Sequence, residues 1–439
     1  MRWGHLDTFA EKKTFAFMIS PAKARALQAR LRAGETIRMH AVVRAGQEPG
    51  AYQIVTGTIP GADLRDEEIV FSCHLDHPRP GANDNASGCA TILEIARTLS
   101  KLIAEKRLAP PRRTIRFVFP PEVEGTLALL NGKPEIAKRI KAAIHLDMVG
   151  GGPETKAIFH VTRGPSSQPS FIYDVAQSIG SAVNDQTEQF ASTGSAKYPL
   201  VSKDGGKEPL RAAMVPLTLG SDHEVYSDSS FGIPAIYLND WPDRYIHTNK
   251  DVAANIDPTK LLRAGFIAAA SGYALARMGP DDSRELLDVM QDRAIERAAN
   301  PRRRELTYAR FALWYERTIL ESLSRFGLTP PSNASIAAPL YPMSKITPTG
   351  KVYRRNPAIK GLMSVFGYDY FADKYGVENA RKIKLSEDYR YEALNLVDGK
   401  RTTSEIRDAL SAIYSPVDLA EVEEYLAALA TIGVVSSSP

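Results

Sequence analysis

The sequence has little cysteine, little excess charge of either sign and no long apolar run. Only Cys73 and Cys89 occur among 439 residues, so no disulfide framework is expected and burial of both thiols is predicted. The 55 basic and 51 acidic residues leave a net charge of +4, too little to indicate binding to nucleic acid or an anionic membrane. No apolar stretch approaches the roughly 20 residues of a membrane span, and residues 1–20 lack a signal-peptide core. We therefore predict a cytoplasmic protein without a membrane partner.

The composition is that of a globular protein with more than one domain. Hydrophobic residues make up 44% and charged residues 24% of the chain, as in ordinary folded proteins. Strand patterns alternate with amphipathic helix patterns, which predicts an α/β fold with a mixed, largely parallel twisted sheet flanked by helices. We divide the chain into an N-terminal appendage (1–50), an α/β core (51–280), a helical and irregular connecting region (281–384) and a small domain (385–439). The three helices and final short strand of the last domain are typical of a winged helix.

The stretch FSCHLDHPRPGANDNASG, residues 71–88, predicts a metal site. A run of strand-forming residues delivers His74 and Asp76, which share a side because strand residues two apart point the same way. A loop rich in Pro and Gly then reverses the chain and presents Asp84 ahead of an amphipathic helix. Ligand-bearing loops of this kind gather at the carboxyl edge of an α/β sheet.

Later strand ends supply further candidate ligands. Carboxylates and imidazoles at loop positions suit zinc, and one carboxylate that bridges two ions is the usual cocatalytic arrangement. A nearby glutamate can then accept the proton of an activated water. His77 and His145 are interpreted more modestly, as a loop residue and as a buried hydrogen-bonding partner. The further candidates are Glu122, Glu124, Asp147 and His247.

Six strings together resemble the M28 family of zinc aminopeptidases. They occur in one order over about residues 50–278, and as a set they are specific. More narrowly, the chain resembles a bacterial branch with an aminopeptidase-like core, a C-terminal winged helix and a truncated protease-associated region. The resemblance implies a zinc-exopeptidase-like fold that removes N-terminal residues from peptides. The strings are HLDHPRPGANDNASG, PEVEGT, LDMVG, GSDH, FGIPAI and YIHTNKD.

The resemblance also implies roles for individual residues. His74 and Asp147 would hold one zinc ion, and Asp84 would bridge to a second ion that His247 also binds. Asp76 would orient the His74 ring through its N–H. The residues implied to lie near the substrate are Ser221, Asp222 and His223.

One departure from the family pattern leaves the number of zinc ions open. The family has two adjacent glutamates two residues from a glycine, of which the first is the base and the second a ligand. Here Glu122 occupies the base position, and Val123, which cannot bind metal, occupies the ligand position before Gly125. Either Glu124 substitutes in a reshaped turn, or Glu122 is itself the ligand, or the second ion is weak or absent. We expect one or two zinc ions and an aminopeptidase with Glu122 as general base.

Two other functions compete with this prediction. One is a single-zinc acyl transfer on the same fold, such as glutaminyl cyclisation. The other is a degenerate peptidase that acts as a binding or regulatory protein beside a DNA-binding domain. Residues 418–433 contain four acidic and no basic side chains, whereas a helix that faces phosphates needs the opposite charge. We therefore predict a peptide or aminoacyl substrate, no nucleic acid, and a homo-oligomer or protein partner through the C-terminal domain.

Overall fold

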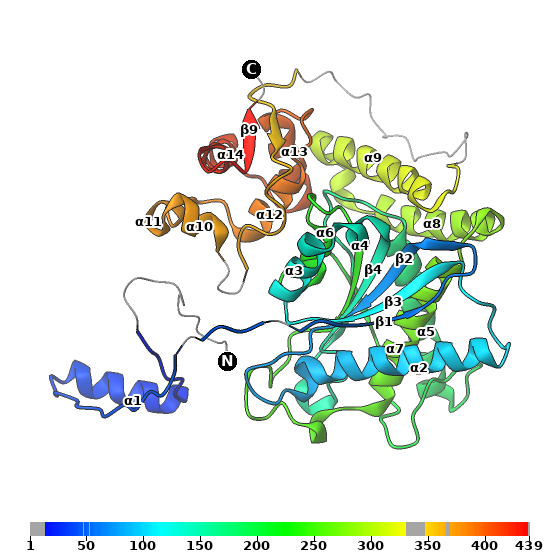
Figure 1. The fold of residues 1–439 in the computed structure, drawn as a ribbon, viewed down its shortest axis with the longest axis horizontal. Coiled ribbons are helices and arrows are strands. Elements are labelled where there is room, and N and C mark those ends of the chain that lie inside the picture. Colours follow the sequence, from blue (N-terminus) through cyan, green and yellow to red (C-terminus); the bar gives the residue numbers. More distant parts are fainter. Residues whose placement is uncertain (1–13, 47, 52, 331–346, 366–368, 438–439) are drawn as a thin grey trace.

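A seven-stranded mixed sheet forms the centre of the protein (Figure 1). The computed structural model describes residues 14–46, 48–51, 53–330, 347–365 and 369–437. The strand order is β1-β3-β2-β4-β7-β5-β6. Pairing is antiparallel only between β1 and β3 and between β7 and β5, so the predicted mixed, largely parallel α/β sheet is confirmed. The strands are β1 Val55–Ile59, β2 Leu64–Ser72, β3 Arg113–Phe119, β4 Ile140–Asp147, β5 Phe159–Thr162, β6 Ala213–Val215 and β7 Ala235–Asp240.

Helices cover both faces of the sheet, as the apolar strands require. Successive strand side chains point to opposite faces, so Ile69 and Phe71 pack with helices α2, α5 and α7. Val70 packs on the other face with α3 and α6. No helix in the described ranges has both the length and the apolar character needed to cross a membrane. These helices are α2 Gly88–Ala104, α3 Glu124–Gly132, α4 Pro134–Arg139, α5 Ile172–Thr193, α6 His223–Ser227 and α7 Pro258–Arg277.

The N-terminal segment contributes one helix, α1 (Pro21–Arg32), away from the sheet (Figure 1). Ser20 precedes this helix, and its hydroxyl accepts the Lys23 N–H at 3.3 Å. None of the residues of α1 is buried. The helix therefore adds nothing to the hydrophobic core, and its assignment as the remnant of a protease-associated region stays a prediction.

Two helices after the sheet domain, α8 (Ser283–Ala298) and α9 (Leu306–Glu321), are joined to it by a buried ionic network. The guanidinium of Arg297 donates to Asp174 on α5 at 2.6 Å and to Glu316 on α9 at 2.8 Å. Asp174 has no exposed surface and Glu316 is almost fully buried. Arg297 thus pairs with two carboxylates that have little access to water, and Arg163 lies 3.6 Å from Asp174 as well.

The C-terminal part has its own hydrophobic core. Among the described residues, helices α10, α12, α13 and α14 supply buried side chains to it, together with an antiparallel pair of short strands. The core also includes Tyr353, Met363 and Phe371, which lie before the predicted boundary at residue 385. The last three helices and the final strand agree with the expected elements, the strand at Tyr353–Arg355 that pairs with it was not expected, and the winged-helix assignment stays a prediction. The elements are β8 Tyr353–Arg355, α10 Tyr370–Tyr375, α11 Val377–Ala380, α12 Glu387–Asn395, α13 Thr403–Ile413, α14 Leu419–Thr431 and β9 Val435–Ser437.

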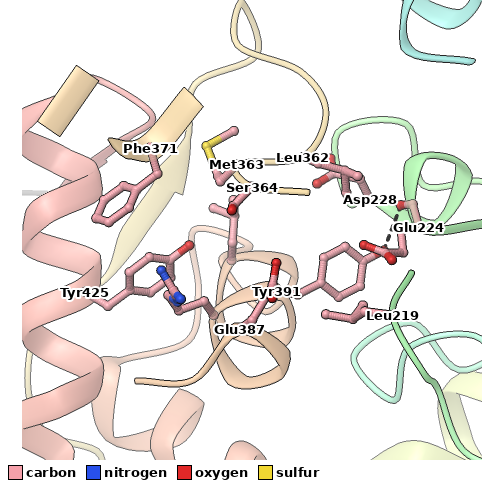
Figure 2. Close-up of a pocket in the computed structure, with 12 residues that line it drawn as sticks. Leu219, Glu224, Asp228, Leu362, Met363, Ser364, Phe371, Glu387, Tyr391 and Tyr425 are labelled. Carbon is pink, nitrogen blue, oxygen red and sulfur yellow. Dashed lines mark hydrogen bonds between the residues drawn. The ribbon is translucent and has the colours of Figure 1, made fainter. Parts of the chain in front are cut away.

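Helix α12 packs directly against loops of the sheet domain. The carboxylate of Glu392 has no exposed surface and accepts the backbone N–H groups of Ser166 at 2.7 Å and Ser167 at 2.9 Å. Figure 2 shows the pocket where the two parts meet, with Tyr391 beside Glu224. The Tyr391 hydroxyl donates to the Glu224 carbonyl at 2.8 Å. The C-terminal part therefore contacts the sheet domain at Glu224, the residue directly after residues 221–223.

Candidate metal centre

The loop that carries Asp84 is fixed by hydrogen bonds from three other segments. It follows β2 and runs through Ala82–Ser87, where the backbone of Asp84 and Asn85 is not helical. The Asn83 side chain accepts the Gly150 N–H at 2.9 Å, beyond the end of β4. The carboxylate of Asp251 accepts the backbone N–H groups of Asn83 at 2.7 Å and Asp84 at 3.0 Å. Asp251 was not singled out from the sequence, although it ends the string YIHTNKD, and it joins the His247 loop to the Asp84 loop.

Two groups of candidate ligands share Asp84. Its Oδ1 lies 3.3 Å from His74 Nε2, which in turn lies 3.2 Å from Asp147 Oδ1. Its Oδ2 lies 3.2 Å from His77 Nε2 and 3.0 Å from His247 Nε2. Ligand atoms on a tetrahedral zinc ion are about 3.3 Å apart, given bonds of about 2.0–2.1 Å. The spacing within each group therefore fits one divalent cation. Asp84 belongs to both groups, and each of its two carboxylate oxygens faces one of them.

The two histidines of the H-x-D-H string are oriented in the same way. His74 Nδ1 lies 3.0 Å from the Asp76 carbonyl, and His77 Nδ1 contacts the Arg79 carbonyl. A carbonyl oxygen only accepts hydrogen bonds, so each Nδ1 carries the proton. Each Nε2 then points its lone pair at the candidate metal position, as in histidine ligands whose other nitrogen is held by a carbonyl. The predicted role of Asp76 is corrected in one respect, because its carbonyl rather than its carboxylate lies closest to His74 Nδ1.

Glu122 lies beside the first group without belonging to it. Its Oε1 is 4.0 Å from His74 Nε2 and accepts the Ser221 hydroxyl at 3.2 Å. Its backbone N–H donates to the Asp76 carboxylate at 2.7 Å, which fixes the turn after β3. Burial raises the pKa of Glu122 well above its usual value, and the neighbouring carboxylates, Asp147 first, act in the same direction. A carboxylate in this position suits a proton acceptor.

The side chain at the position of the glutamate ligand in the M28 pattern lies in the apolar core and belongs to neither ligand group. Val123 is 1% exposed and packs in the apolar cluster on one face of the sheet. Its φ of 59° is unusual for a β-branched residue, and its N–H donates to Asp222 Oδ1 at 2.9 Å. Glu124, a predicted ligand, is exposed at the start of α3 and belongs to neither group. The turn after β3 therefore does not bring the Glu124 carboxylate to either ligand group, as the predicted substitution of Glu124 for the missing glutamate would require.

His77 lies in a loop and was not among the candidate ligands predicted from the sequence. The structure brings it to Asp84 and His247, so the interpretation of His77 as a loop residue misses its contacts. The available signal was its place three residues after His74 in a loop that the Pro and Gly residues turn back on itself.

Ser221 connects the candidate base with the first ligand group. Its hydroxyl lies 2.8 Å from Asp147 Oδ2 and 2.8 Å from His145 Nε2. His145 is fully buried and its Nδ1 lies 2.9 Å from the Ser72 hydroxyl, as expected of a structural histidine. Burial holds the pKa of His145 well below its usual value. The Ser221 hydroxyl therefore contacts both the Asp147 and the Glu122 carboxylates and helps to fix their positions.

Asp222 and His223, predicted to lie near the substrate, have no exposed surface. Asp222 anchors the Val123 backbone, and burial raises its pKa to about 7. The His223 ring stacks on Tyr237 with 4.0 Å between centroids, and burial lowers its pKa to about 4. These contacts are structural, and they do not support the substrate-binding role, which stays a prediction for both residues and for the equally buried Ser221.

The two cysteines are bonded to each other, which corrects the expectation of two free thiols. The predicted burial is confirmed, with Cys73 0% and Cys89 9% exposed. The bond joins the end of β2 to the start of α2, on either side of the Asp84 loop. Disulfides are typical of oxidising compartments, and the cytoplasmic location stays a prediction.

Comparisons with known proteins identify the family of the central part of the chain. Residues 55–271 match the profile of Peptidase family M28, so the chain carries an M28 family domain. Aminopeptidase YwaD of Bacillus subtilis (strain 168) is 24% identical over 229 residues, which cover 50% of this chain and 44% of that protein. The chain spans less than half the length of the curated relatives that it matches.

Solved structures resemble part of the chain. BSAP, a zinc aminopeptidase from Bacillus subtilis, is 20% identical with a TM-score of 0.39, covering 51% of this chain and 50% of that chain. Macrostomum lignano glutaminyl cyclase is 17% identical with a TM-score of 0.39, covering 52% of this chain and 73% of that chain.

Proposed function

We propose that the M28 family domain of residues 55–271 is a zinc-dependent aminopeptidase, a hydrolase that removes N-terminal residues from peptides. One observation carries the proposal. Two groups of nitrogen and oxygen ligands meet on the carboxylate of Asp84, and a separate glutamate, Glu122, stands beside them. A metal position with an adjacent carboxylate that is not a ligand is the arrangement that metal-assisted hydrolysis requires.

The first group fits zinc. His74, Asp84 and Asp147 offer one imidazole nitrogen and two carboxylate oxygens, and three protein ligands leave a position open for water or substrate. Zinc bound there would polarise the scissile carbonyl and lower the pKa of a bound water. The protein keeps these ligands in place through the Asp76 carbonyl on His74 and the Ser221 hydroxyl on Asp147.

Glu122 acts as the general base. Its carboxylate takes a proton from the attacking water and returns it to the amine of the leaving peptide. Two contacts fix its position: Asp76 accepts its backbone N–H, and its Oε1 lies 3.2 Å from the Ser221 hydroxyl. Asp76 thereby has a positioning role on both sides of the site, through its carbonyl to His74 and its carboxylate to Glu122.

The test is release of the N-terminal residue from a series of short peptides by zinc-loaded protein. We expect hydrolysis that stops when a chelator removes zinc and returns when zinc is restored. A peptide with an acetylated N-terminus is the matched control, because an aminopeptidase needs the free amine. Equal cleavage of free and acetylated peptides, or hydrolysis that a chelator leaves unchanged, would contradict the proposal.

A further inference from the structure

We infer that His77 is a ligand of a second divalent cation, which it binds together with Asp84 and His247. In this role His77 takes the place of the carboxylate that the M28 pattern has at position 123, where this chain has valine. The inference rests on the proposed function, because the second cation shares Asp84 with the first. It concerns a ligand set of two imidazoles and one carboxylate, which suits zinc or a similar transition-metal ion.

The three donor atoms are already gathered around one point. The Nε2 atoms of His77 and His247 lie 3.2 Å and 3.0 Å from the same oxygen of Asp84. The two imidazole rings are 6.0 Å apart between centroids and tilted by 44°. Their side chains are 13% and 25% exposed, against 7% for Asp84. The position is therefore enclosed by protein on one side and open to solvent on the other, as a catalytic cation site needs to be.

The loop before Asp84 is built to bring His77 back over that residue. A Cβ atom on Gly81 would lie 3.0 Å from His77 Cε1 and would overlap the carbonyl of Asp84. Only a glycine allows this close approach. The Arg79 carbonyl accepts the Nδ1 proton of His77 and so turns Nε2 toward Asp84. The ring orientation is thus set by the backbone of the same loop.

A cation at this point would satisfy all three donor atoms at once. With its proton on Nδ1, a neutral His77 presents a lone pair to a carboxylate oxygen, which is a repulsive arrangement. His247 Nε2 faces that same oxygen. A single divalent cation between the three atoms turns each of these contacts into a metal–ligand bond. Without a cation, the Asp84 oxygen needs a proton on at least one Nε2.

The experiment is a zinc count on the full chain. Metal-free protein is loaded with zinc, dialysed, and measured by mass spectrometry of the elements, with a zinc titration for the affinity of each site. We expect the wild-type protein to hold zinc in both groups. In His77→Ala the weaker site should lose at least about 100-fold in affinity, since a direct ligand matters at least as much as its orienting partner, while the first site keeps its zinc.

Two further variants make the result decisive. His77→Gln, which keeps side-chain bulk without an imidazole nitrogen, should behave like His77→Ala and serves if the alanine variant does not fold. His40→Ala removes an exposed histidine far from the site in sequence and should leave both zinc ions in place. Wild-type protein that holds one zinc, or a folded His77 variant with unchanged zinc affinity at both sites, would overturn the inference. Peptide hydrolysis by wild-type protein with one zinc would overturn only the inference and leave the proposed function standing.

Discussion

Glu122→Gln separates the base from the ligands. The substitution keeps the shape of the side chain and removes its ability to accept a proton at neutral pH. The backbone N–H bond to Asp76 does not involve the side chain, and the amide oxygen can still accept the Ser221 hydroxyl. Glu122 belongs to neither ligand group. We therefore expect the variant to fold and to keep its zinc.

The expected loss of turnover follows from the role of a general base. Such a group contributes about 10²–10⁴-fold to the rate, which corresponds to about 2.7–5.5 kcal/mol of activation free energy at about 1.4 kcal/mol for each factor of ten. The loss should appear in kcat with little change in KM, because the amide keeps the volume of the site. Removal of this charge should not lower the free energy of unfolding of the metal-free protein, since burial and the neighbouring Asp147 raise the pKa of Glu122 and so disfavour its ionised form.

The assay is steady-state hydrolysis of an aminoacyl anilide with a zinc count on the same protein samples. Glu124→Gln is the matched control, because it makes the same chemical change at an exposed glutamate two residues away. The control should keep both turnover and zinc. Zinc loss in Glu122→Gln would make Glu122 a ligand, and turnover within about twofold of wild type would refute its role as base.

Three other substitutions test the site and the packing that supports it. Asp84→Ala removes the shared ligand and should abolish zinc binding at both groups together with turnover; full zinc occupancy in this variant would refute the shared site. Arg297→Met leaves the buried carboxylate of Glu316 without its arginine and leaves Asp174 with Arg163 at 3.6 Å, and it should lower the free energy of unfolding by about 3–5 kcal/mol in urea denaturation. A loss below about 1 kcal/mol would show that water reaches both acids. Glu392→Ala removes the acceptor of two backbone N–H groups and should cost about 1–3 kcal/mol for each donor left buried, measured in the same way. An unchanged unfolding midpoint would show that the contact between Glu392 on α12 and the loop of Ser166 and Ser167 does not stabilise the fold.

The sequence was sufficient for the sheet and for the ligands that end its strands. Alternating and continuous apolar runs mark β2, β3, β4 and β7, and parallel strands bring their carboxyl ends to one edge. The strand ends marked His74 and Asp147 as candidates, the resemblance to the M28 family implied that they share a metal, and the structure brings their side chains within 3.2 Å. The strands β5 and β6, with four and three residues, are too short for any period to be recognised.

The remaining parts of the site depend on contacts that no local pattern encodes. His77 reaches Asp84 only because the loop folds closely over Gly81. Val123 and Glu124 follow Glu122 directly, yet the positive φ of Val123 sends one side chain into the core and leaves the other exposed. Asp222 follows Ser221 in a polar string, which suggests exposure, but it is fully buried as an acceptor for the backbone. Burial of polar side chains follows from tertiary packing and is therefore poorly predicted from residue type.

The most direct test of the proposed function is mass spectrometry of one peptide that begins with glutamine and carries a free N-terminus, after incubation with zinc-loaded protein. An aminopeptidase adds water and releases the first residue, so the account predicts free glutamine and a peptide one residue shorter. A glutaminyl cyclase would instead give a peptide that keeps every residue and has lost ammonia. That product, or a peptide left intact by protein whose zinc content has been verified, would contradict the account.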